Sequence, residues 1–294
     1  MCEDKFLEII KEEICKRVGE EICVNTRKVR KNNNVVYLAV LLQQKNQNIA
    51  PTIYLNEFYE AYQQGESPEA ITDKILEIYE QGKVDEPVDM DFFLDFEKVK
   101  DRIAYRLINA DKNKELLEKV PHIIYMDLAI CFYYAFHDNV LGEGMILIYN
   151  SHMDMWKTSH EELMQLAERN TPELFPELLV TMEEILGDIF EGQMSSKLYV
   201  LSNQQKCHGA AALLYPGILQ EAAAKLGGDY YVLPSSVHEV LLLKKQEYED
   251  SGVLQDMIED ANANHVLEEE VLSDNLYYYD VVEEKLIQVK RSGK

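Results

Sequence analysis

The sequence is short of basic residues, and this shortage narrows the partners that the protein can have. Its 294 residues include 29 lysines and arginines against 53 aspartates and glutamates, which gives a formal net charge of -24. Such a surface repels phosphate backbones and anionic lipid, so we expect neither a nucleic acid nor a membrane as partner. The one dense basic group is expected to form an exposed turn. It consists of Arg27, Lys28, Arg30 and Lys31, followed by three asparagines.

Paired cysteines and long apolar runs are also missing. The five cysteines are scattered, with no Cys-x-x-Cys spacing, which argues against a zinc ribbon and a disulfide framework. Reduced thiols of this kind are typical of cytoplasmic proteins. The N-terminal residues are acidic where a signal peptide would be basic, and no apolar stretch approaches the roughly 18 residues of a membrane span. We therefore expect a cytoplasmic protein.

The signatures of the common cofactor enzymes are absent as well. The sequence contains no P-loop, no G-x-G-x-x-G, no kinase motif, no G-x-S-x-G elbow and no H-E-x-x-H. We expect no cofactor, and whether the protein is an enzyme stays open.

The apolar pattern predicts an α+β or α/β protein in which a mixed β-sheet is flanked by helices. Strands are expected at 35–42, 49–55, 103–108, 145–149, 198–202, 230–233 and 240–243, and hairpins within 122–136 and 275–289. For the run 122–136 a buried helix is the alternative, because a short apolar run does not distinguish the two. Helices are expected at 3–18, near 55–65, at 67–82, along a stripe from Leu178 to Leu186, and at 209–228 with an interruption at Pro216-Gly217. Ser67-Pro68-Glu69 has the composition of a helix N-terminus.

The polar, proline-containing segment 83–91 is the best linker candidate. It predicts an N-terminal α/β subdomain of residues 1–85 and a larger C-terminal α/β subdomain of residues 86–294. The alternative is a single compact unit in which this segment is a long internal connection.

Polar side chains gather where three of the predicted strands end. If these strands share one sheet, the side chains could line a common binding pocket, because ligand crevices form at the carboxyl ends of strands in open sheets. The candidates are Asn150, Ser151, Ser202, Asn203, Ser235, Ser236 and His238. Turn-forming residues also belong at strand ends without any ligand.

One spacing suggests a metal site. His152 and Asp154 resemble the strand-end His-x-Asp of zinc hydrolases, in which the histidine binds the metal and the aspartate orients it from the second shell. In an extended chain both would project to the same side. The rest of that signature is missing, since Glu183-Glu184 follow too soon and lie on an expected helix. No metal site is favoured.

Two further groups evoke nucleophilic catalysis. Ser235, Ser236, His238 and Glu239 combine the residue types of a catalytic triad, but a triad is a spatial arrangement and neighbours in a strand face opposite sides. Cys207-His208 would need a histidine from elsewhere to form a thiolate pair. We interpret both groups as loop residues.

The segments YVLPSSVHEVLLL (231–243), GAAALLYPGILQEAAAKLGGDYY (209–231) and YLNEFYEAYQQGES (54–67) resemble a bacterial family of unknown function that is typical of anaerobic gut bacteria. The resemblance covers most of the chain. It implies a cytoplasmic protein with no assigned reaction, substrate or cofactor, and no catalytic residues can be transferred from it.

These observations favour a non-enzymatic intracellular module for binding or regulation, whose partner is an unknown protein or small molecule. The alternative is a metal-assisted hydrolase of a small molecule or peptide that uses His152 and Asp154 with help from His238.

Overall fold

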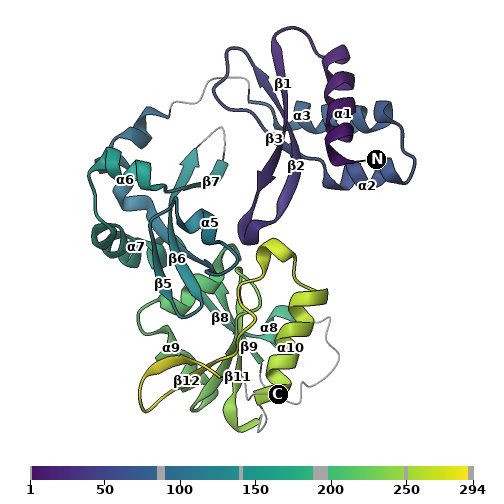
Figure 1. The fold of residues 1–294 in the computed structure, drawn as a ribbon. Helices are drawn as coiled ribbons and strands as arrows, with labels where there is room; N and C mark the ends of the chain where they lie inside the picture. Colours follow the sequence, from purple (N-terminus) through teal and green to yellow (C-terminus); the bar gives the residue numbers. More distant parts are fainter. Residues whose placement is uncertain (1, 85–89, 139–141, 188–197, 248–250, 291–294) are drawn as a thin grey trace. The chain divides into compact units, whose positions relative to one another are not determined.

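The computed structural model describes residues 2–84, 90–138, 142–187, 198–247 and 251–290 (Figure 1). The chain divides into two compact units, one of residues 1–92 with 138–142 and the other of residues 93–137 with 143–294. The expected boundary after residue 85 lies within 85–89, outside the described residues.

The first unit is a three-stranded antiparallel sheet with helices packed on one face. Its elements are α1 (Glu3–Arg17), β1 (Ile22–Arg30), η1 (Asn32–Asn34), β2 (Val36–Gln44), β3 (Thr52–Tyr54), α2 (Asn56–Gln63) and α3 (Pro68–Gly82). Side chains alternate along a strand, so Leu38, Val40 and Leu42 of β2 share one side. They belong to one core with Ile10 of α1 and Ile71 of α3.

The predicted start of α3 is confirmed. The Ser67 hydroxyl accepts a hydrogen bond from the Ala70 amide at 3.2 Å, and Pro68 occupies the first turn, where its missing N–H costs nothing.

The basic group lies mainly on strand β1, and its prediction as a turn is wrong for those residues. The turn itself follows at Asn32–Asn34, where Asn33 and Asn34 have positive φ. Pairing of β1 with β2 extends to Arg30↔Val36, which places the basic side chains on a strand. Lys28 is neutralised there by Glu3, at 2.8 Å from its Nζ.

The second unit contains two antiparallel sheets. The first has the order β4-β6-β5, with β7 also paired to β6. Its strands are β4 (Ile103–Asn109), β5 (His122–Tyr125), β6 (Leu128–Asp138) and β7 (Gly142–Leu147), and the helical elements along it are η2 (Asp91–Leu94), α4 (Phe96–Val99), η3 (Lys100–Arg102), α5 (Lys114–Leu117), α6 (Asn150–Trp156) and α7 (His160–Leu174). Helix α7 is tied to β4 because Thr171 Oγ1 accepts from the Tyr105 amide at 3.1 Å.

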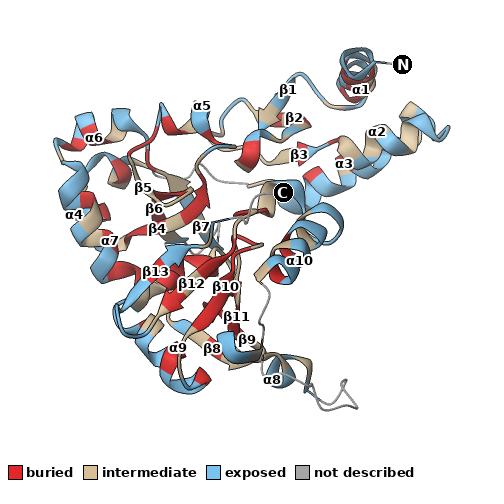
Figure 2. Ribbon diagram, turned by 60° about the horizontal axis from the view of Figure 1, so that its bottom comes forward, coloured by how far each residue is buried: buried red, intermediate tan, exposed pale blue. Residues whose placement is uncertain are grey.

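The second sheet has six strands in the order β13-β12-β10-β11-β9-β8. Its strands are β8 (Glu177–Thr181), β9 (Leu198–Asn203), β10 (Tyr230–Leu233), β11 (Val240–Lys244), β12 (Tyr277–Asp280) and β13 (Lys285–Gln288), and its helical elements are α8 (Met182–Leu186), η5 (Gly209–Leu214), α9 (Ile218–Leu226), η6 (Lys245–Glu247), α10 (Ser251–Asn264) and η7 (Glu268–Glu270). The inner strands β9, β10 and β11 are the most buried of this sheet (Figure 2).

The α+β class is confirmed, and every strand pair with a described register is antiparallel. Both predicted hairpins form, as β5–β6 and β12–β13. The alanine-rich segment is interrupted at Pro216-Gly217 as predicted, although its first half is the 3-10 helix η5.

The predicted helix from Leu178 to Leu186 is wrong in its first half. Residues Glu177–Thr181 form β8, because pairing with β9 supplies backbone hydrogen bonds that local propensity does not anticipate. Helix α8 begins only after Thr181, which forms a reciprocal capping box with Glu184.

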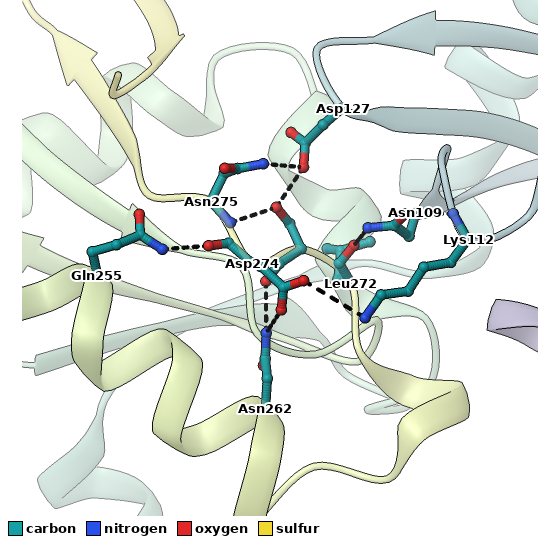
Figure 3. A network of polar contacts seen from close by, with 9 residues as sticks. Asn109, Lys112, Asp127, Gln255, Asn262, Leu272, Asp274 and Asn275 are labelled. Carbon is teal, nitrogen blue, oxygen red and sulfur yellow. Dashed lines mark hydrogen bonds and ion pairs between the residues drawn. The ribbon is translucent and has the colours of Figure 1, made fainter. Parts of the chain in front are cut away.

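A network of polar contacts joins the two sheets of the second unit (Figure 3). It is centred on the carboxylate of Asp127, in the tight turn between β5 and β6. Asp127 Oδ2 accepts from Ser273 Oγ at 2.5 Å and from Asn275 Nδ2 at 2.9 Å, and its Oδ1 accepts from the Tyr277 hydroxyl at 2.6 Å. On the same segment the Leu272 carbonyl accepts from Asn109 Nδ2 of β4 at 3.0 Å. Residues 272–277 are therefore attached to the first sheet just before they enter the second.

In the described part of the chain, no helix combines the length and the apolar composition that a bilayer crossing requires.

Replacing Asp127 with alanine should lower the free energy of unfolding of the second unit by about 2–4 kcal/mol, because a buried serine and a buried tyrosine hydroxyl lose a charged acceptor. Urea denaturation followed by the fluorescence of Trp156, the one tryptophan in the sequence, measures this. Asp111→Ala is the matched control, since the Asp111 side chain is 81% exposed in its ion pair with Lys114. Equal losses in the two variants would contradict a central role for Asp127.

Candidate functional site

Three strands of the six-stranded sheet place five of the seven predicted binding residues at one end of these strands. Strand β11 is antiparallel to both β9 and β10, and Val240 at its start pairs with Leu201 near the end of β9. The carboxyl ends of β9 and β10 therefore lie at the same end of the strands, on either side of the start of β11. Ser202 and Asn203 end β9, and the loop from β10 to β11 contains Ser235, Ser236 and His238.

Two serines hold the main chain of His238. The Ser202 hydroxyl donates to the His238 carbonyl at 2.7 Å, and the Ser236 hydroxyl accepts from the His238 amide at 3.0 Å. The loop is also bonded along its backbone, since the Val237 amide donates to the Glu270 carbonyl at 2.8 Å and the Leu272 amide donates to the Ser235 carbonyl at 3.1 Å. Both serine hydroxyls thus have structural partners.

The side chain of His238 lies between a second histidine and a carboxylate. Its Nδ1 accepts from the His208 amide at 3.3 Å, so the ring proton is assigned to Nε2, which lies 3.4 Å from Glu270 Oε1. The two imidazoles stack with centroids 5.6 Å apart. We call Ser202, Asn203, Cys207, His208, Ser236, His238 and Glu270 the strand-end cluster.

The loop that carries Cys207 and His208 is a tight turn closed by side-chain hydrogen bonds. Asn203 closes it, because its side chain donates to the Cys207 carbonyl at 2.8 Å and accepts from the Cys207 amide at 3.2 Å. Lys206 and His208 both have positive φ, a conformation that is costly for residues with a side chain. Such strain persists only where the surroundings impose it.

Gly209 permits the close approach of this loop to the sheet edge. A Cβ atom at this position would lie 2.1 Å from Ser202 Oγ, 2.5 Å from the His238 carbonyl oxygen and 2.6 Å from the Asn203 amide nitrogen. No larger side chain fits without displacing backbone.

Burial decides the ionisation of the cluster. It raises the pKa of the Cys207 thiol, an effect that the charge of Arg106 only partly offsets, so the thiol stays protonated at neutral pH. Burial, helped by Arg106 and His238, lowers the pKa of His208 to about 3, and the ring is neutral. Burial also raises the pKa of Glu239.

Arg106 of β4 carries a charge that has no counter-charge among the described residues. Its Nε is buried without a hydrogen-bond partner, and none of the ion pairs found in the described ranges includes its side chain. Along the sheet it is opposite Cys131, and Tyr133 lies on the same face of the neighbouring strand. Strand β4, which carries Arg106, packs against η5 directly after the 206–208 loop, and the charge of Arg106 contributes to the pKa shifts of Cys207 and His208. His208 Nδ1 is likewise buried without a partner.

Asn150 and Ser151 do not join the cluster. They begin helix α6, where Asn150 is hydrogen-bonded to the Glu118 and Lys119 carbonyls. The strand before them, β7, belongs to the four-stranded sheet and ends at Leu147. The expectation that this strand shares a sheet with β9 and β10 is therefore wrong.

His152 and Asp154 lie on helix α6, so the expected extended geometry is wrong. Residues two apart on a helix point in divergent directions, and Asp154 is exposed. His152 Nδ1 accepts from the Tyr149 amide at 3.1 Å, and its ring packs against Phe93 at 5.1 Å between centroids. Across the described residues, no three His, Cys, Asp or Glu side chains are placed to hold one metal ion.

A cavity of about 400 Å³ lies elsewhere, at the outer strands of the six-stranded sheet. Tyr231, Lys245 and Tyr278 line it together with residues 287–290. Lys245 Nζ donates to the Tyr278 hydroxyl at 2.8 Å, and that hydroxyl donates to Asp229 at 2.5 Å. These polar groups satisfy one another, so this cavity is the weaker candidate.

Sequence reasoning missed Arg106, Gly209 and Glu270 as members of the site. Arg106 could have been recognised from the sequence, because it is the one charged residue inside the apolar run IAYRLI (103–108). Gly209 and Glu270 gave none, since an ordinary glycine and an acidic tract acquire their roles only when distant loops meet.

A protein-family model, described as a family of unknown function (DUF5688), matches residues 3–281. Neither the curated proteins nor the solved structures contain a match to the chain.

Gly209→Ala should reduce the free energy of unfolding by about 1–3 kcal/mol or more, because the added methyl group overlaps backbone atoms that cannot move independently. Chemical denaturation measures the loss. Gly19→Ala is the control, as nothing lies within 4 Å of a Cβ there. A Gly209→Ala variant as stable as the control would show that the loop relaxes freely.

The buried, neutral His208 should make the free energy of unfolding decrease as the pH falls below about 6.5. Its pKa in the folded state lies below the value of about 6.5 in the unfolded chain, so protons bind preferentially to the unfolded state. The contribution of neutral His208 to the free energy of unfolding is fully present above pH 6.5 and falls as the pH decreases toward 3. The slope is at most about 1.4 kcal/mol per pH unit, and it is smaller here because His208 is only partly buried.

The variant His208→Asn tests this, because asparagine tolerates positive φ and does not titrate. Between about pH 7 and pH 5 its free energy of unfolding should decline less steeply than that of the wild type. His265→Asn, at a side chain that is 73% exposed, should leave the slope unchanged. Parallel curves for wild type and His208→Asn would contradict the assignment.

Proposed function

The chain belongs to DUF5688, a family of unknown function, and we propose that it is a non-enzymatic module for binding or regulation whose ligand site is the strand-end cluster. One observation carries the proposal: the hydroxyls and the thiol that could act as nucleophiles in the cluster are either hydrogen-bonded to main chain or held in the protonated form. The hydroxyls of Ser202 and Ser236 are hydrogen-bonded to His238 main-chain atoms, and the Cys207 thiol stays protonated.

A nucleophile requires an adjacent base or a lowered pKa. His238 is not placed as such a base, since its Nδ1 accepts from the His208 amide and its Nε2 lies 3.4 Å from Glu270 Oε1. The cluster is held by hydrogen bonds, is partly buried and has two buried polar atoms without partners in or beside it, His208 Nδ1 and Arg106 Nε, which suits recognition of a ligand without turnover.

We also propose a bacterial cytoplasmic setting. All five cysteines are free, which suits a reducing compartment, and the net charge of -24 favours a partner that tolerates an acidic surface. That partner is a protein or a small molecule.

An esterase and peptidase assay tests the proposal. The purified full chain is incubated with p-nitrophenyl acetate and with an aminoacyl p-nitroanilide, with and without Zn²⁺. We expect the same background rate for the wild type, Cys207→Ala and His238→Asn, because no group is activated. Saturable turnover that is lost in His238→Asn would overturn the proposal.

The same assay covers the metal-assisted alternative. His152→Ala should bind Zn²⁺ no differently from the wild type in calorimetric titration, because His152 belongs to no group of three possible metal ligands among the described residues. A one-to-one zinc site that depends on His152 and brings hydrolysis would favour the alternative.

A further inference from the structure

Arg106 is the charge in the second unit that needs an explanation. Arg106 is half-buried, and its Nε is fully buried without a hydrogen-bond partner, so no described group offsets the desolvation of that nitrogen. The chain has 53 acidic residues, yet no described one is paired with Arg106. Neutral replacement of such a charge is often stabilising, so its presence calls for a role other than stability.

Three neutral groups lie within the electrostatic reach of Arg106, and no acidic residue in the described ranges forms an ion pair with it. The Cys207 thiol and the His208 imidazole are neutral, and Tyr133 stays protonated because burial raises its pKa. His208 Nδ1 is a second buried atom without a partner in this region. One fixed positive charge with neutral polar groups beside it is the composition of an anion site.

We propose that Arg106 anchors a binding site for a small oxyanion, a carboxylate or phosphate group, between strand β4 and the 206–208 loop, with His208 as the second contact. The inference rests on the proposed function and names the ligand class of the same region. The planar guanidinium matches a carboxylate or phosphate because two of its N–H groups can bond two oxygens at once. The backbone at Lys206 and His208 has positive φ, a conformation that persists where the surrounding structure imposes it.

The test measures thermal unfolding through Trp156 fluorescence at constant ionic strength, with chloride replaced by inorganic phosphate or by acetate. Wild type should show a saturable increase in Tm of several degrees with at least one of them, because a ligand bound only by the folded state stabilises it. A response to phosphate alone identifies a phosphate-bearing ligand, and a response to acetate alone identifies a carboxylate.

Arg106→Met should lose this increase and have a higher Tm than wild type without the anion, because the unpaired charge is gone while the length of the side chain is kept. Arg169→Met is the matched control: Arg169 is paired with Asp101 at 3.2 Å on the surface, and the variant should retain the full response. His208→Asn, whose backbone conformation suits asparagine, should weaken the response and serves if Arg106→Met does not fold.

Three results would overturn the inference: no anion response in wild type, an equal response in wild type and Arg106→Met, or an anion-free Arg106→Met less stable than wild type. An equal response would indicate a general salt effect, and a less stable variant would make Arg106 structural. Failure of the proposed function is distinguishable, since His238-dependent turnover would refute it while leaving an Arg106-dependent anion response intact.

Discussion

The carboxylate of Asp127 is the interaction on which the second unit depends. It binds Ser273, Asn275 and Tyr277 and thereby fixes the segment that leads into β12. The residues just before this segment hold the loop between β10 and β11, through backbone hydrogen bonds from Val237 to Glu270 and from Leu272 to Ser235. The position of His238 is thus set by a turn in the other sheet, and the site inherits its rigidity from this chain of contacts.

Rigidity and reactivity are separate properties in the strand-end cluster. Its serines, asparagine and histidines converge as a catalytic site would, but each hydroxyl binds main chain, and burial works against a thiolate and against an imidazolium. The same desolvation that suppresses nucleophilic chemistry strengthens any contact made to a ligand, because a low local dielectric enhances electrostatic interactions. Arg106 is where this matters most, since its guanidinium carries a full positive charge and five N–H donors.

Much of the local structure could be predicted from residue patterns. The hairpin at Asp127, the N-terminus at Ser67 and the break at Pro216-Gly217 follow from turn and capping chemistry, which acts over a few residues. Two of the errors have the same origin. Residues 177–181 form a strand because β9 is beside them, and Arg27 and Lys28 lie on a strand because β2 pairs with it; neither partner is visible in the local sequence.

The sequence by itself determined the α+β class, the acidic charge and the polar residues that end the strands. Only the tertiary structure decided which of those residues meet: Ser202, Asn203, Ser236 and His238 share a sheet edge, whereas Asn150, Ser151, His152 and Asp154 belong to helix α6. The physical reason is that a strand end is specified by neighbours in the chain, while a site is specified by register and sheet order. The members of the site show this, because Asp127, Gly209 and Glu270 each lie against residues far away in the sequence.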